Sequence, residues 1–97
     1  MRKLRKIKIC GHTYKIHYKK ELHKDGEDLH GYCDHDTGNI FLDKRLEGSR
    51  LAEVLLHECI HAIDLSLNME LGEARVNLLG IEVYRLITDN KLNLLKE

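Results

Sequence analysis

The sequence contains no proline, no tryptophan and no long apolar run. None of its hydrophobic stretches approaches the roughly 20 residues that span a bilayer, so we expect no membrane-spanning segment and no membrane partner. The basic start of the chain is not followed by an apolar segment of the kind that a secretory signal peptide requires. These absences favour a cytoplasmic location.

A net charge of either sign is also missing. Sixteen Lys and Arg residues balance sixteen Asp and Glu residues, so the charge gives no reason to expect nucleic acid or an anionic membrane as a partner. The one local excess is basic and lies near the start, at Arg2, Lys3, Arg5, Lys6 and Lys8. A basic edge strand or a solvated tail is the favoured interpretation, and a nucleic-acid contact is the alternative.

The sequence contains only three cysteines, and they are widely spaced. Cys10, Cys33 and Cys59 form no CxxC motif, which argues against a disulfide framework or a cysteine zinc site. We expect Cys59 to pack as a small apolar residue, and a disulfide between Cys10 and Cys33 only if their strands pair. With 42% apolar and 33% charged residues, no repeat and no internal linker, residues 1–97 are interpreted as one small globular domain.

The first half of the chain has the alternation of strands. Apolar and basic residues alternate over residues 6–18 around Gly11-His12, which predicts a hairpin. The polar residues 21–30 are predicted to form a loop. A turn rich in Asp, Gly and Asn separates residues 31–34 from residues 40–42, which predicts a second hairpin.

The second half is predicted to be helical, which makes the fold class α+β. Apolar residues recur at helical spacing up to Leu67, after a predicted N-cap at Gly48-Ser49. A turn over residues 68–72 separates this helix from a second one over residues 73–89. Residues 91–97 are predicted to be a short helix or a frayed end.

The first helix carries an HExxH motif, His57-Glu58-Cys59-Ile60-His61. Residues four apart lie on one face of a helix, so the two imidazoles can bind one zinc ion. Glu58 can then take a proton from a metal-bound water and pass it to the leaving amine. The alternative is a surface helix whose histidine pair is accidental.

A catalytic zinc site also needs a third protein ligand. The extended motif with a third histidine fails, because Asp64 stands where its glycine would be and Leu67 where its histidine would be. The remaining candidates are carboxylates. Glu73 is favoured, because the start of an antiparallel second helix would lie near His61; Glu70 and Asp64 are alternatives. Asp64 is better suited to a supporting hydrogen bond, and Glu73 alone could simply stabilise a helix N-terminus.

Asn77 and Gly80 share a helical face with Glu73. Asn77 could hydrogen-bond a zinc-bound histidine, and Gly80 could let the two helices approach closely, although core packing explains a glycine equally well. The other histidines are not assigned as ligands: His12, His17, His23, His30 and His35.

Several segments resemble the small phage and prophage HExxH zinc metallopeptidases, which are related to the ImmA/IrrE-type peptidases and the minigluzincins. They are residues 56–62, 73–76 and 86–90, with 31–34 and 39–43 upstream, and the resemblance extends from about Gly11 to Asn90. It implies a zincin-like fold, in which a small antiparallel or mixed sheet packs on the HExxH helix. It also implies that the second helix supplies the third zinc ligand, Glu73, and that the strand around residues 39–43 holds a peptide by strand addition.

The favoured function is therefore a zinc-dependent endopeptidase with Glu58 as general base. The resemblance implies a peptide or protein substrate, such as a regulatory protein, in the cytoplasm of a bacterial host. One alternative is a zinc-stabilised protein-binding module with little catalysis. The other is a scaffold without metal.

Overall fold

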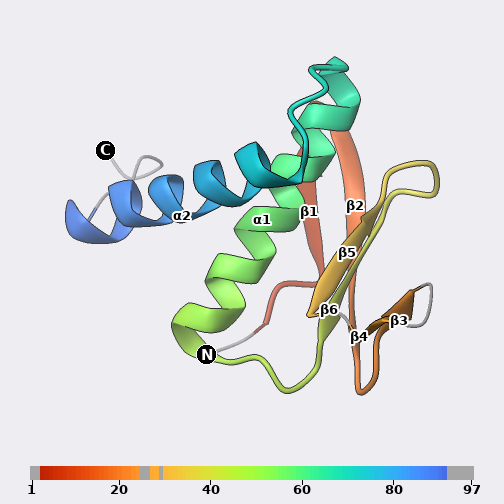
Figure 1. Cartoon of the computed structure of the whole chain (residues 1–97). Coiled ribbons are helices and arrows are strands. Elements are labelled where there is room, and N and C mark those ends of the chain that lie inside the picture. Colours follow the sequence, from red (N-terminus) through yellow and green to blue (C-terminus); the bar gives the residue numbers. More distant parts are fainter. Residues whose placement is uncertain (1–2, 25–26, 29, 92–97) are drawn as a thin grey trace.

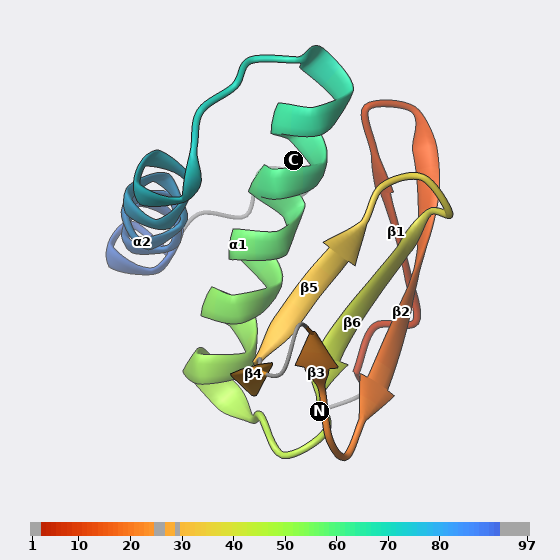
Figure 2. The same ribbon diagram turned by 45° about the vertical axis from the view of Figure 1, so that its right-hand side comes forward.

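A computed structural model describes residues 3–24, 27–28 and 30–91. It has an α+β architecture, in which a four-stranded mixed sheet packs on one helix and a second helix crosses the first (Figures 1 and 2). The larger sheet contains β1 (Lys6–Ile9), β2 (His12–Lys19), β5 (Gly31–Asp34) and β6 (Asn39–Asp43). The small hairpin consists of β3 (His23–Lys24) and β4 (Glu27–Asp28), and the helices are α1 (Gly48–Leu67) and α2 (Glu73–Asp89).

The two predicted hairpins are confirmed, and the sheet joins them side by side. The strand order is β1-β2-β6-β5, with antiparallel pairs at both ends and a parallel pair, β2 and β6, in the middle. Ile16 lies opposite Ile40 in this central pair. The parallel pairing joins strands far apart in the sequence, so local alternation of apolar residues does not reveal it.

The expectation that the strand around residues 39–43 accepts a peptide is wrong. This strand is β6, and both of its sides are already paired, with β2 and with β5. The reason is its composition, because Ile40 and Leu42 are fully buried in the centre of the core. The edge strand beside α1 is β5, which pairs only with β6 among the described strands.

The core lies between the sheet and α1. It contains alternate strand residues and one face of the helix: Ile9, Tyr14, Ile16, Ile40, Leu42, Cys59 and Ala62. Cys59 packs there as expected, and burial raises the pKa of its thiol to about 11. Cys10 and Cys33 are both free thiols, and they belong to opposite halves of the sheet, in the β1–β2 turn and on β5.

The segment predicted as a loop over residues 21–30 is not all irregular. It contains the β3–β4 hairpin, in which His23 pairs with Asp28 and Lys24 with Glu27. The preceding Leu22 is buried. The sequence does not reveal so short a hairpin, because main-chain hydrogen bonds form it and no apolar residues alternate along its strands.

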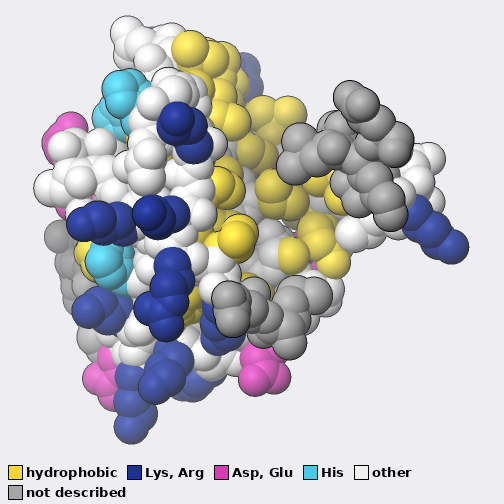
Figure 3. Space-filling model, turned by 180° about the vertical axis from the view of Figure 1, so that it is seen from behind, with side chains coloured by type: hydrophobic (Ala, Val, Ile, Leu, Met, Phe, Trp, Pro, Cys, Tyr) yellow, Lys and Arg dark blue, Asp and Glu magenta, His cyan; other side chains and the backbone are white. Residues whose placement is uncertain are grey.

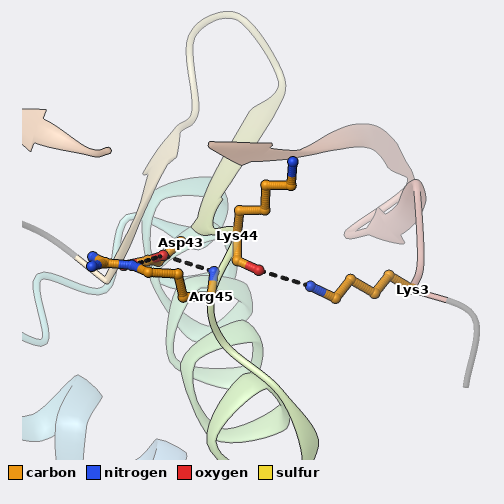
Figure 4. Close-up of polar contacts among 4 residues, drawn as sticks. All are labelled: Lys3, Asp43, Lys44 and Arg45. Carbon is orange, nitrogen blue, oxygen red and sulfur yellow. Dashed lines mark hydrogen bonds and ion pairs between the residues drawn. The ribbon is translucent and has the colours of Figure 1, made fainter. Parts of the chain in front are cut away.

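A buried carboxylate fixes the entry into α1. Asp43, only 3% exposed, accepts hydrogen bonds from the backbone N–H and the guanidinium of Arg45, at 2.8–3.1 Å (Figure 4). These bonds hold the pKa of Asp43 at about 2. The connection between β6 and α1 also contacts the N-terminal segment, because the Lys3 ammonium donates a hydrogen bond to the Lys44 carbonyl oxygen at 3.1 Å. The predicted N-cap at Gly48-Ser49 is wrong, since both residues lie inside the helix and the N-cap is Glu47, which forms no side-chain cap hydrogen bond.

The basic residues near the start lie partly on an edge strand, as favoured. Lys6 and Lys8 are exposed on β1, which pairs only with β2 in the described part of the chain, and Figure 3 shows a cluster of basic side chains on one side of the molecule. Arg2 and residues 92–97 lie outside the described residues, so the prediction for the C-terminal end is not tested beyond Lys91. No described helix combines the length and apolarity needed to cross a membrane.

Gly31 sets the distance between the edge strand and α1. A Cβ atom there would lie 3.0 Å from the Phe41 carbonyl oxygen and 3.0 Å from Val54 Cγ1. We expect Gly31→Ala to lower the free energy of unfolding by about 1–2 kcal/mol, because the overpacking exceeds the gain from a less flexible unfolded chain. Chemical denaturation measures this change.

Gly80→Ala is the matched control. The added Cβ would lie 3.5 Å from His57 Cα, an ordinary contact, inside a helix that prefers alanine. This variant is expected to gain about 0.5–1 kcal/mol. Equal stability of the Gly31→Ala variant and the wild type would show that β5 can move away from α1 without cost.

Candidate metal centre

The helix α1 presents His57 and His61 one turn apart on the same face. Their ring centroids are 4.8 Å apart, and the two Nε2 atoms lie 3.2 Å from each other. Both imidazoles are largely covered, with 21% and 25% of the side chain exposed. Burial lowers the pKa of His61, which favours the neutral form that binds metals.

The α1–α2 loop brings the start of α2 back to these histidines. After α1 ends, Asn68 takes a left-handed conformation, with φ of 52°, and Met69 N–H bonds to the Asp64 carbonyl at 3.1 Å. The Asp64 carboxylate accepts a second bond from Leu71 N–H at 3.1 Å. The loop therefore returns along α1, and α2 begins at Glu73 next to the middle of α1 (Figure 1).

The two helices are not antiparallel as expected. In Figure 1, α2 runs across the direction of α1, and in Figure 2 it is seen almost end-on while α1 remains upright. Gly80 of α2 is buried against His57 of α1, where even an added Cβ would make only an ordinary contact, 3.5 Å from His57 Cα. Glu73 still reaches His61, because the α1–α2 loop folds back along α1. An antiparallel packing of the two helices is therefore not needed to bring Glu73 there.

Glu73 completes a group of three ligand atoms. One carboxylate oxygen lies 2.8 Å from His57 Nε2 and the other 3.0 Å from His61 Nε2. In the described part of the chain, this is the one group of three or more such side chains whose ligand atoms lie within 4.8 Å of one another, and it could hold a metal ion.

The donor set fits a tetrahedral cation. Bonds of about 2.0–2.1 Å separate the ligand atoms around tetrahedral zinc by about 3.3 Å, slightly more than the distances observed here. A small rotation of the Glu73 side chain, which is 70% exposed, supplies the difference. Two nitrogens and a carboxylate with an open solvent side match the chemistry of a three-ligand site that keeps one position free.

The alternative ligands lie elsewhere. Asp64 is engaged with the loop, so its supporting hydrogen bond goes to Leu71 N–H and not to a histidine. Glu70 is exposed in the loop with φ of 55° and is not part of the group. Of the three candidate carboxylates, the structure brings only Glu73 to both histidines, although its role as a zinc ligand remains a prediction.

Glu58 is a buried acid without a partner. It is 5% exposed, and no described residue forms a hydrogen bond or an ion pair with its carboxylate. Burial, followed by the charge of Glu73, raises its pKa to about 8. Its oxygens are not fully enclosed, because Glu58 lines a cavity and the described residues have only Ser66 Oγ as an enclosed side-chain atom without a hydrogen-bond partner. The carboxyl is therefore accessible from the cavity beside the ligand group.

A cavity of about 280 Å³ opens beside these residues. Its wall includes His57 and Glu58 of α1, Gly31 of β5 and Ile81 of α2. Sequence reasoning missed Arg50, Glu53 and Val54, which also line the cavity. Their signal was available, because they precede His57 by seven, four and three residues and therefore share its helical face.

The remaining sequence candidates have other contacts. Asn77 lines the cavity, but no hydrogen bond joins it to either histidine in the described structure. His35 bonds to the Tyr14 hydroxyl at 2.7 Å, and His17 bonds to Asn39 at 2.7 Å. His30 lies on the cavity wall. Neither His17 nor His35 belongs to the ligand group.

Comparisons with family profiles, with curated proteins and with solved structures give no match to this chain. The resemblance to HExxH peptidases therefore stays a prediction from the sequence.

Proposed function

We propose that the chain is a zinc-dependent endopeptidase with a zincin-like fold. The observation that carries the proposal is the convergence of His57, His61 and Glu73 beside a buried acid, Glu58, whose carboxylate has no hydrogen-bond partner among the described residues. These four residues come from the two helices, and a cavity lies next to them. The arrangement joins a metal ligand set to a proton acceptor and a space for substrate.

Each residue has a separate task in the proposed reaction. His57, His61 and Glu73 would hold the metal, and zinc, when bound, would polarise the scissile carbonyl and acidify a water molecule. Glu58 would accept the proton of the attacking water and later donate it to the leaving amine. A nearby cation would lower the pKa of Glu58 from its raised value, which keeps the carboxylate available as a base.

The proposed substrate is an extended peptide that pairs with β5. This strand is the sheet edge next to α1, and Gly31 at its start lines the cavity. Main-chain hydrogen bonds to such an edge hold a peptide without regard to its sequence. The side chains next to the scissile bond would then meet the cavity between β5, α1 and α2, where Val54 and Ile81 offer apolar contacts.

Zinc content and peptide cleavage test the proposal together. The purified wild type is expected to bind about one zinc per chain and to cleave unstructured protein substrates. Glu73→Gln should weaken zinc affinity by about tenfold or more, because a charged ligand is lost, whereas Glu70→Gln should bind zinc like the wild type. Failure to bind zinc after reconstitution would refute the proposal, and zinc without cleavage would favour a zinc-stabilised binding module.

A further inference from the structure

The helix α2 exposes more apolar surface than its packing explains. It contacts only α1 among the described elements, and only Val76 and Gly80 are buried. Five large apolar side chains are between 37% and 61% exposed: Leu78, Leu79, Ile81, Leu86 and Ile87. Figure 1 shows α2 projecting away from the rest of the molecule. A helix with apolar residues on several sides usually has a partner.

On one face of α2, the spacing of the exposed residues is the same in both directions along the helix. This outer face consists of Arg75, Leu78, Glu82, Leu86 and Asp89, all exposed. At about 100° per residue, the five lie within about 40° of one line, on the side away from Val76 and Gly80. The intervals between them are three, four, four and three residues, so the face is symmetrical about Glu82. Its two ends carry opposite charges.

We propose that two copies of this chain pair through the outer face of α2, with the two helices antiparallel. A two-fold axis at Glu82 sets Arg75 against the partner's Asp89 and Leu78 against the partner's Leu86. Each of these contacts occurs twice, as a two-fold interface requires. The two Glu82 carboxylates meet at the axis, but each already has an ion pair with Arg85 of its own helix at 3.1 Å.

The charges favour a second copy over an unrelated partner. No described residue forms an ion pair with Arg75 or Asp89, and reversal of the helix provides each with its opposite charge. The apolar residues match as well, since one leucine lies on each side of the axis. Any other partner would have to reproduce this pattern of charge and leucine independently.

The pairing leaves the metal centre open. Glu73 and Gly80 lie on the α1 side of α2, so a second copy on the outer face covers neither the histidines nor the cavity. The proposal therefore stands or falls separately from the proposed peptidase function. It assigns α2 two roles, with one side supplying a ligand and the other forming an interface.

Sedimentation equilibrium of charge-swapped variants tests the pairing. The wild type is expected to be a dimer at about 100 µM, since a single helix pair makes a small interface. Arg75→Asp or Asp89→Arg alone turns two attractive contacts into two repulsive ones and should raise the dimer Kd by about tenfold or more. The double variant restores both attractions and should return to a Kd near that of the wild type.

Two further variants, Leu86→Lys and Leu65→Lys, test whether the apolar contact on α2 is needed for the dimer. Leu86→Lys should give a monomer, whereas Leu65→Lys, at a 50% exposed position on α1, should leave the dimer intact. Circular dichroism checks that each variant keeps its helices. A monomeric wild type at this concentration, or a double variant that dimerises no better than the single variants, would overturn the proposal.

Discussion

Replacing Glu58 by glutamine is expected to lower kcat/KM for peptide cleavage by about 10²- to 10⁴-fold. The amide has nearly the same shape, so it fits the buried position, but it cannot accept the proton of the attacking water. The three ligands His57, His61 and Glu73 are unchanged, so zinc content should stay at the wild-type level. Steady-state kinetics and metal analysis on the same preparation separate a loss of chemistry from a loss of metal.

Glu53→Gln is the matched control for this experiment. Glu53 lines the same cavity, one helical turn before His57, but it is not buried. Its variant should keep kcat/KM within about tenfold of the wild type, because it changes the charge near the substrate and not the proton transfer. A Glu58→Gln variant as active as the wild type would remove the general-base role and with it the proposed mechanism.

The local parts of the fold were accessible from the sequence. Periodicity predicts both hairpins and places α2 over Glu73–Asp89, because each pattern depends on residues close together in the chain. The parallel pairing of β2 with β6 was not accessible, since it depends on the burial of Ile40 and Leu42 by the whole molecule. The resemblance to HExxH peptidases implied peptide binding at β6, which is central, whereas the edge strands of the described sheet are β1 and β5.

In the candidate site, too, local features could be predicted from the sequence and long-range ones could not. The spacing of His57 and His61 on one helix is sufficient to place two imidazoles together. The third position depends on the loop, where Asp64 bonds to Leu71 N–H and turns the chain back. Sequence alone could rank Glu73 above Glu70 but could not establish this bond. The steep crossing of α2 over α1 depends on contacts between residues far apart in the chain, such as Gly80 and His57, which periodicity does not encode.

Removal of a histidine ligand is expected to have the largest effect on stability. His61→Ala should abolish stoichiometric zinc binding, because two of the three ligand atoms remain but lose their shared geometry. A metal present at about 1,000 times its Kd stabilises the folded chain by about 4 kcal/mol. In a domain of this size that corresponds to a melting temperature lower by roughly 15–30 °C in the variant.

A chelator separates this metal effect from the loss of a side chain. EDTA should bring the wild type close to the melting temperature of His61→Ala and leave the variant itself unchanged, because the variant has no zinc to lose. His12→Ala, at an exposed position on β2 outside the ligand group, should respond to EDTA like the wild type. If EDTA lowered the melting temperature of His61→Ala as much as that of the wild type, zinc would be bound elsewhere. The convergence of His57, His61 and Glu73 would then be a hydrogen-bonded cluster of the core edge and not a metal centre.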